Sequence, residues 1–403
     1  MKHFTSKPLV TLIMLSCLFL WSACQKEIVA PDQPTDFDTL NSRGPGDIAL
    51  YTLDLDKFAT GIENAFNGKV SGLGYTIFHN NQIYYKGTGG LGWLRRPVDA
   101  PQRAHSANLR QGLASSTKYA TAILVANILE RNGKTLDEKI YKYLPSNWNP
   151  DVNFKNLSFR QLLAHKAGLI KYGNKYAHMK KTVEGGINNI QVTFGTRVYD
   201  NINFFLPHYL VAYMIGKLEN PNLLNQLKNA EKDTIALKNL LASNFRSYMR
   251  SYVFKPSGLT YWDKVDFQPW DNNGIIPFTQ GCKYYTTSNI NEKGSDPDSK
   301  FYESGPGGLY ISAVEYAQMI NATAHGKIIS KNLYSTMKKE LLGFDWALSG
   351  KFGPYYAKNG GARSEEMLID FGGTQVIVIS NCPYSNLAES PSLITNAFDA
   401  ATK

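Results

Sequence analysis

Hydrophobic residues near the N-terminal end of the folded part follow first a helical spacing and then a strand alternation. The stretch "LDKFATGIENAFNGK" (55–69) has apolar residues at helical intervals, which predicts an amphipathic helix. The next stretch, "SGLGYTIFHNNQIYYKGTGGLG" (71–92), contains two β-rich runs on either side of Asn80-Asn81. Two strands separated by a short turn of such residues are typical of a β-hairpin.

Helical patterns dominate from about residue 109 to 260. The stretch "SSTKYATAILVANILERNG" closes with Gly133, and "SFRQLLAHKAG" closes with Gly168, at the positions where glycine commonly ends a helix. A third stretch, "INFFLPHYLVAYMIGKL" (202–218), is strongly apolar. The middle of the chain is therefore predicted to be helical.

Strand patterns return towards the C-terminus. The runs "SEEMLIDF" and "TQVIVISN" flank Gly372-Gly373 as a second hairpin, and "SLITNAFDAATK" is a final amphipathic helix. Strand material at both ends with a helical middle predicts one α/β domain, residues 49–403, into which an all-α part is inserted. We expect the α/β part at about 49–105 and 300–403 and the helical part at about 106–299.

The first residues have the organisation of an export signal. Lys2 and Lys7 precede the apolar run "PLVTLIMLSCLFLW", which is too short for a membrane span, and small residues precede Cys24. The phrase "LWSAC" resembles the lipobox of bacterial lipoproteins, with Trp21 where leucine is usual. We expect a signal peptide at 1–23, a lipidated Cys24 and a polar tether at 24–48; plain secretion is the alternative.

Composition and charge exclude several classes of protein. Hydrophobic residues make up 43% of the 403 residues, which indicates a folded chain, and the formal net charge is +10. There is no dense Lys/Arg block or nucleic-acid motif, no His pair at metal-ligand spacing and no nucleotide-binding loop, so we expect no nucleic-acid partner, no metal and no cofactor. Outside the signal region, Cys282 and Cys382 remain, and the sequence leaves their pairing open.

The first candidate catalytic motif is Ser115-Ser116-Thr117-Lys118, an S-x-x-K pattern. A serine needs a base to accept its proton, and residues three apart on a helix share one face, so Lys118 is within reach of Ser115. A buried lysine has a lowered pKa and can act as that base. The S-x-x-K pattern is weak alone, because Ser335-Thr336-Met337-Lys338 repeats it.

Two further motifs follow in order, Tyr199-Asp200-Asn201 and Lys358-Asn359-Gly360, the latter directly before a strand hairpin. With S-x-x-K they resemble the signature set of the serine β-lactamase and penicillin-binding-protein family, in the branch of class C β-lactamases, DD-peptidases and esterases. Flanking phrases such as "LSFRQLLAHKAGL", "YVFKPSGLTY" and "SGPGGLYISAVEYAQM" are similar to family phrases. The resemblance runs from about 70 to 381 and implies a β-lactamase/transpeptidase-like α/β fold, with an antiparallel sheet flanked by terminal helices.

The resemblance also implies catalytic roles. Ser115 is expected to form an acyl-enzyme, with Lys118 and Tyr199 sharing general acid/base duty and Asn201 orienting Lys118 and the substrate. The oxyanion hole is expected from the backbone N–H groups of Ser115 and Gly361.

The third motif is expected to bind and orient the substrate through Lys358, Asn359 and Gly360, with Lys358 supplying positive charge to a substrate carboxylate. Asn359 departs from the family pattern, because threonine or serine is usual there and the hydroxyl is lost. Arg363 is either a replacement for that contact or an exposed loop residue.

Other features are given a structural role or left open. Asp200 replaces a small residue beside Tyr199 and either raises its pKa or points outward. The segment of about 220–244 is interpreted as an insertion that covers one side of the cleft. His165 is expected to support its loop, and Glu365-Glu366 point to opposite faces of a strand, so they are not expected to form an acid/base pair.

Two functions of different classes follow. The first is an envelope serine hydrolase, in the periplasm or at the cell surface, that acts on an ester, a β-lactam or a D-amino-acid peptide. The second is a non-catalytic protein of the same fold that captures envelope peptides or glycans. A small-molecule or peptide acyl substrate and a lipid anchor in the membrane are the expected partners, and the oligomeric state is left open.

Overall fold

The structure is a computed structural model that describes residues 51–187, 195–269, 282–383, 387 and 391–403. The predicted signal peptide (1–23), Cys24 and the tether (24–48) lie outside these residues. Within the described chain, no helix is both long enough and apolar enough to cross a membrane.

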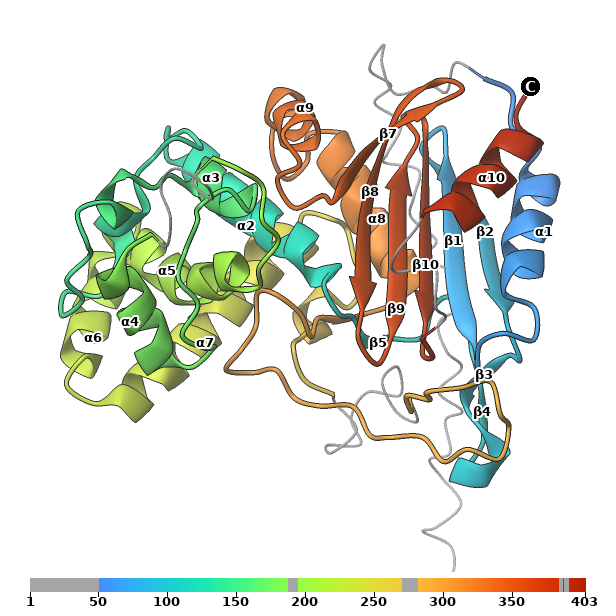
Figure 1. The fold of residues 1–403 in the computed structure, drawn as a ribbon, viewed down its shortest axis with the longest axis horizontal. Helices are drawn as coiled ribbons and strands as arrows, with labels where there is room; N and C mark the ends of the chain where they lie inside the picture. The colour runs from blue at the N-terminus through green and yellow to red at the C-terminus, as the bar shows by residue number, and fades with distance from the viewer. Residues whose placement is uncertain (1–50, 188–194, 270–281, 384–386, 388–390) are drawn as a thin grey trace, which may run out of the picture. The chain divides into compact units, whose positions relative to one another are not determined.

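A six-stranded antiparallel sheet is the centre of the α/β part (Figure 1). Its strand order is β2-β1-β10-β9-β8-β7, so strands from the two ends of the chain meet in its middle. The strands are β1 (Leu73–His79), β2 (Gln82–Gly89), β7 (Trp346–Gly350), β8 (Gly353–Gly361), β9 (Glu365–Asp370) and β10 (Thr374–Ser380).

Both predicted hairpins are present. Asn80 and Asn81 connect β1 to β2 with φ values of +47° and +69°, the left-handed backbone that a two-residue hairpin turn requires and that asparagine tolerates. Gly372, with φ of +92°, lies in the turn between β9 and β10. The turn residues thus fix the register of the sheet at these two hairpins.

Alternating residues of β10 face two separate cores. Val376 and Val378 pack with α1 (Leu55–Phe66) and α10 (Ser392–Ala401), the first and last helices of the described chain. Ile377 and Ile379 belong to the opposite core, which includes α8 (Ala313–Ala324). Figure 1 shows α1 and α10 against one face of the sheet and α8 behind the other. Because both faces are covered, β1, β9 and β10 are buried along their whole length.

The helical part lies beside the sheet and is built around α2 (Thr117–Arg131). Every residue from 117 to 126 is buried, which explains why this helix is apolar on all sides. It packs with α5 (Ile202–Leu218), and the surrounding helices are α3 (Phe159–Leu163), α4 (Tyr176–Gly185), α6 (Pro221–Ala230) and α7 (Thr234–Met249).

The remaining elements of the described chain are α9 and several short ones. A ninth helix, α9 (Lys331–Lys339), follows α8, and a π-helical turn, Arg250–Phe254, follows α7. Two small ladders are formed by β3 (Trp93–Arg95) with β4 (Arg103–Ala104) and by β5 (Gln111–Gly112) with β6 (Tyr310–Ile311). Single 3₁₀ turns occur at Pro97–Asp99, Ile140–Tyr143, Phe154–Asn156 and Trp262–Lys264.

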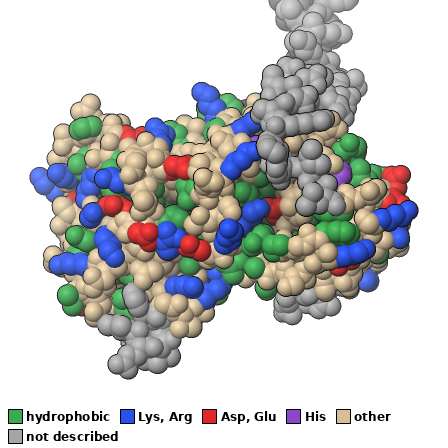
Figure 2. Space-filling view, turned by 90° about the horizontal axis from the view of Figure 1, so that it is seen from above, with side chains coloured by type: hydrophobic (Ala, Val, Ile, Leu, Met, Phe, Trp, Pro, Cys, Tyr) green, Lys and Arg blue, Asp and Glu red, His purple; other side chains and the backbone are tan. Residues whose placement is uncertain are grey.

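The predicted fold class is confirmed: the sheet is antiparallel, terminal helices flank it, and a helical part separates its first two strands from its last four. Cys282 and Cys382, whose pairing the sequence left open, are both buried as thiols. Side chains of both signs are interspersed on the face shown in Figure 2.

The region after α7, which has few regular elements, is held by a buried carboxylate. Asp266 is 1% exposed, and its carboxylate accepts hydrogen bonds from the Arg246 side chain and from the backbone N–H of Phe267. The guanidinium group of Arg250 lies 2.7 Å from the same carboxylate. The backbone carbonyl of Asp266 accepts the N–H of Tyr310 at 2.7 Å. Asp266 therefore ties α7 to the start of β6.

We expect Asp266→Ala to lower the free energy of unfolding by about 3–5 kcal/mol, because the change leaves two arginines partly or fully buried without their carboxylate. Urea unfolding followed by circular dichroism measures the loss. Asp263→Ala is the matched control: Asp263 is half exposed and pairs with Lys264 at 3.3 Å, so its loss should cost less than about 1 kcal/mol. Equal effects of the two substitutions would contradict this assignment.

Candidate active site

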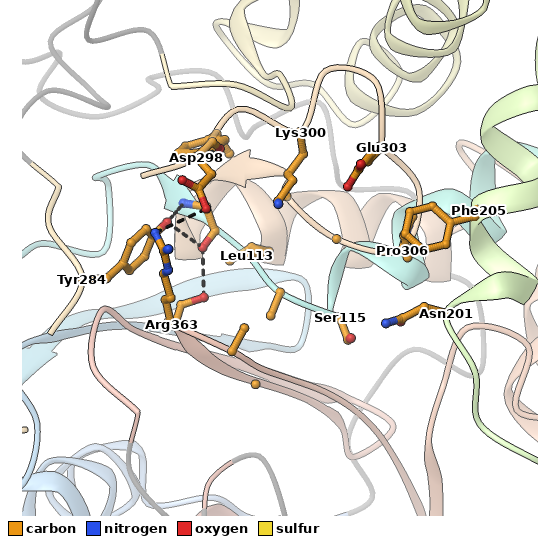
Figure 3. Close-up of a pocket in the computed structure, with 18 residues that line it drawn as sticks. Leu113, Ser115, Asn201, Phe205, Tyr284, Asp298, Lys300, Glu303, Pro306 and Arg363 are labelled. Carbon is orange, nitrogen blue, oxygen red and sulfur yellow. Dashed lines mark hydrogen bonds and ion pairs between the residues drawn. The ribbon is translucent and has the colours of Figure 1, made fainter. Parts of the chain in front are cut away.

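Ser115 is presented by a short strand that runs into a buried helix. The strand β5 pairs with β6, and the Leu113 N–H continues this pairing to the carbonyl of Leu309 at 2.8 Å. Helix α2 begins two residues after Ser115, whose carbonyl accepts the N–H of Lys118 at 3.0 Å. Ser115 is thus held in the turn before the helix, with its side chain at the edge of a cavity (Figure 3).

Lys118 lies beneath Ser115, completely buried. Its Nζ donates to Ser115 Oγ at 2.8 Å and to the carbonyl of Pro306 at 2.8 Å, and it lies 5.1 Å from the centre of the Tyr199 ring. Burial, and secondarily the charge of Lys358, hold the pKa of Lys118 well below the usual value of a lysine. A neutral amine in contact with the serine hydroxyl is suited to accept its proton.

Tyr199 reaches the same oxygen from the other side. Its hydroxyl donates to Ser115 Oγ at 2.8 Å. Burial raises the pKa of Tyr199 to about 12, an effect that the hydrogen bond with Ser115 and the charge of Arg197 partly oppose. Tyr199 therefore keeps its proton at neutral pH, which makes it a proton donor and leaves Lys118 as the better base.

His165 supports Tyr199 and does not touch Ser115. The two rings lie 4.5 Å apart between centroids, and the Asp200 N–H donates to His165 Nδ1 at 3.2 Å. Burial, together with the positive charge of Arg197, lowers the pKa of His165 to about 2, so the ring is neutral. The contacts of this histidine are those of a structural support.

Asp200 points away from Ser115. Its carboxylate accepts the N–H of Ile202 at 2.9 Å, at the start of α5, and lies 3.6 Å from Lys171 Nζ on the surface. Its charge is one of the smaller influences that raise the pKa of Tyr199. Asn201 precedes α5 and lines the cavity, whereas the hydrogen bonds of the Lys118 amine go to Ser115 and Pro306.

The third motif lies at the end of β8, and its lysine turns inward. Lys358 is 1% exposed, and its Nζ lies 2.5 Å from Asp345 Oδ2 and 2.6 Å from the carbonyl of Asn359. Asp345 also pairs with Arg197 at 3.2 Å. Burial lowers the pKa of Lys358, while Asp345 opposes that shift. The charge of Lys358 is thus compensated inside the protein, next to the Tyr199 ring at 5.8 Å.

Gly360 has no room for a side chain. A Cβ at this position would lie 2.8 Å from the backbone nitrogens of Ser115 and Ser116 and 1.9 Å from Glu366 Oε2. The end of β8 therefore passes directly beside the backbone of the serine. Ser115 and Gly361, from which an oxyanion hole is expected, both line the cavity.

Glu366 is a residue at the site that the sequence analysis set aside. It is 1% exposed in β9, accepts the Ala114 N–H at 2.9 Å and accepts the Ser364 hydroxyl, so it holds the residue next to the nucleophile. Burial raises the pKa of this carboxyl group. The one sequence signal was the pair Glu365-Glu366 directly before the apolar run "MLI" of the predicted strand, a pattern that does not reveal a partner.

The cavity beside Ser115 has a volume of about 370 Å³. Its walls come from residues 112–115, from Asn201 and Phe205 of the α5 end, from several residues between 298 and 310, and from residues 361–364. Figure 3 shows Lys300 and Glu303 projecting into it on the side opposite Arg363. The segment 220–244, interpreted as a cover, forms α6 and part of α7 and contributes no lining residue; the described residues 298–310 form that wall instead.

Arg363 is an exposed residue at the mouth of the cavity. Its side chain is 53% exposed, lies 3.3 Å from Asp298 and donates to the carbonyl of Asp296 at 3.2 Å. Among the described residues, no group of three or more His, Cys, Asp or Glu side chains is arranged to hold a metal ion.

The chain is similar to a known protein family and to several solved structures. Residues 56–216 match the family model described as Beta-lactamase. No curated protein sequence matches the chain. Among solved structures, the chain is similar to FmtA from Staphylococcus aureus, with a TM-score of 0.61, 16% identity, and coverage of 89% of this chain and 93% of that one.

Two further structures have the same fold. The D-amino acid amidase from Ochrobactrum anthropi SV3 matches with a TM-score of 0.58 and 15% identity, over 85% of this chain and 97% of the amidase. A class C beta lactamase from Rhodobacter sphaeroides matches with a TM-score of 0.57 and 14% identity, over 86% and 98%. The family match includes Ser115, Lys118 and Tyr199, and the structural matches cover 85–89% of this chain. The chain is therefore similar to the beta-lactamase family over residues 56–216 and has the fold of these solved structures.

Proposed function

We propose that the protein hydrolyses an ester, a β-lactam or a D-amino-acid peptide through a covalent acyl-enzyme at Ser115. The observation that carries the proposal is that Ser115 Oγ lies 2.8 Å from both Lys118 Nζ and the Tyr199 hydroxyl. A hydroxyl held between a buried amine and a phenol has a proton acceptor on one side and a proton donor on the other. The D-amino acid amidase and the class C beta lactamase among the similar structures support this range of substrates.

The proposed reaction uses these groups in two half-reactions. Ser115 Oγ attacks the acyl carbon while its proton passes to Lys118, and the backbone N–H groups of Ser115 and Gly361 stabilise the oxyanion. When the intermediate collapses, the bond to the leaving group breaks and that group takes a proton, which Tyr199 can deliver and regain from Lys118. Water then attacks the acyl-enzyme by the same proton path and releases the acid.

The mature protein is further proposed to act in the bacterial envelope, held to a membrane through a lipid on Cys24. This part rests on the sequence of the first 48 residues: the charged start, the apolar run, and the small residues before Cys24. The following polar segment would then serve as the tether.

Ser115→Ala is expected to abolish covalent labelling by a fluorophosphonate, because the attacking oxygen is removed. Intact-mass measurement of the purified domain detects the adduct, and a penicillin used in parallel tests whether β-lactams are accepted. Ser335→Ala is the matched control, since Ser335 begins the second S-x-x-K sequence but lies in α9. Absence of an adduct on the folded wild type would instead favour a protein that binds without turnover.

The rate of this labelling should rise with pH. Lys118 accepts a proton only when it is neutral, and its neutral fraction increases as pH rises through its lowered pKa, so the midpoint should lie below the usual lysine value of about 10.4. Tyr199 keeps its proton over this range because its pKa is about 12. Rates measured from pH 5 to 9 test this; Lys118→Met should reduce them by about 100-fold or more and remove the rise. A wild-type rate that falls as pH rises, or a Lys118→Met variant that reacts as fast as the wild type, would exclude Lys118 as the base.

Cys24→Ala should prevent incorporation of a radiolabelled fatty acid in bacteria and move the protein from the membrane fraction to the soluble fraction, because the lipid anchor would be lost. Gel autoradiography and fractionation give the two readouts. Wild-type protein that incorporates no label would support plain secretion.

A further inference from the structure

The cavity beside Ser115 contains two charged side chains of opposite sign that pair with no residue that the structure describes. Among its charged lining residues, Asp298 and Arg363 pair with each other at 3.3 Å. The ammonium group of Lys300 and the carboxylate of Glu303 form no hydrogen bond or ion pair with any residue of the described chain. Both side chains are half-buried, and both project into the cavity in Figure 3.

The side chain of Lys300 packs against Gly308, which lies in the same loop. Gly308 has a φ of +86°, and a Cβ there would lie 2.3 Å from Lys300 Cγ and 2.5 Å from Lys300 Cβ. The stem of the lysine therefore occupies the space that a side chain at 308 would need. The backbone N–H of Lys300 also donates to the carbonyl of Phe267 at 2.7 Å.

Glu303 is placed by the turn that follows. Its N–H donates to the carbonyl of Lys300 at 3.1 Å, and the Ser304 hydroxyl donates to the same carbonyl at 2.9 Å. Gly305, with φ of +119°, then packs on α5, because a Cβ there would lie 2.4 Å from the carbonyl of Phe204. This closed turn holds two opposite charges three residues apart without joining them.

Lys358 is poorly placed to bind a substrate anion in this cavity. Its ammonium is compensated by Asp345 at 2.5 Å, and it is not among the residues that line the cavity. A carboxylate bound here would therefore meet Lys300 as the uncompensated cation. In a concave site, a few fixed charges of this kind select the ligand and set its orientation.

We infer that Lys300 and Glu303 bind the two ends of a zwitterionic substrate, a small peptide-like acyl compound that carries one carboxylate and one ammonium group. Lys300 binds the carboxylate, and Glu303 binds the ammonium. The cavity volume of about 370 Å³ limits this substrate to a small ligand, of the size of a dipeptide. The inference rests on the proposed acyl transfer at Ser115 and assigns the substrate class and its two specificity-determining residues.

The test uses four esters with the same scissile bond and the same side chains, each made in both enantiomeric forms. The acyl end carries a free ammonium or its acetylated form, and the leaving end carries a free carboxylate or its primary amide. The ratio of kcat/KM between paired esters measures the preference for each charge. We expect wild type to prefer the doubly charged ester by about tenfold or more at each end, in at least one enantiomeric series.

Each substitution should affect one preference. Lys300→Gln should lower the carboxylate preference about tenfold and retain the ammonium preference, and Glu303→Gln should do the reverse, so each variant is the control of the other. Lys283→Gln removes the same charge from a lysine that pairs with Asp296 and does not line the cavity, so it should retain both preferences. Thermal unfolding verifies that all three variants are folded.

The outcomes separate this inference from the proposed function. Wild type that reacts with the fluorophosphonate but shows no preference for either charge, or preferences that survive the two substitutions, would overturn the inference alone. An unlabelled wild type that hydrolyses none of the esters would overturn the acyl-transfer function, and the inference with it. Loss of both preferences in Lys283→Gln would show that net charge, not these contacts, selects the substrate.

Discussion

The site depends on one costly placement, a lysine amine buried under a serine with only neutral oxygens as its direct partners. Lys118 contacts the Ser115 hydroxyl and the Pro306 carbonyl, and the charge with the largest effect on its pKa, that of Lys358, is of the same sign. Burying an ammonium without a contacting carboxylate is unfavourable, so the folded state favours the neutral amine. The protein thus obtains a base by desolvation, and the rest of the fold has to keep water away from it.

That requirement explains the packing around the first turn of α2. The Tyr316 hydroxyl donates to the carbonyl of Ser116, and Thr121 donates to the carbonyl of Gly305, both at 2.8 Å. The helix is therefore fastened to the loop that supplies Pro306 and the charged wall of the cavity. One buried helix positions the nucleophile and the base, while the loop that covers the base also presents the charges that face a ligand. Ser115 and Lys118 on one side and the charged cavity wall on the other are consequently held by the same contact between α2 and this loop.

Periodicity was sufficient to predict the hairpins, the terminal helices and the helical middle, because those elements bury one face or are buried completely. The three short motifs were sufficient to predict which residues meet at Ser115. The wall at 298–310 could not be predicted, since it has little regular structure and its side chains are placed by Gly308 and Gly305, whose neighbours are not adjacent in sequence. Asp345 and Glu366 were also missed, because compensation of a buried charge depends on three-dimensional contacts that no local spacing encodes.

The pairing of β1 with β10 has a consequence for how the chain folds. His79 and Thr374 face each other at one end of that pairing, and a side-chain hydrogen bond joins them across 295 residues. Contacts of such long range form late, because most of the loop-closure entropy has to be lost before they are gained. The centre of the sheet remains incomplete until almost the whole polypeptide has been synthesised, so a nascent chain presents its N-terminal residues to cellular machinery well before the folded domain can close.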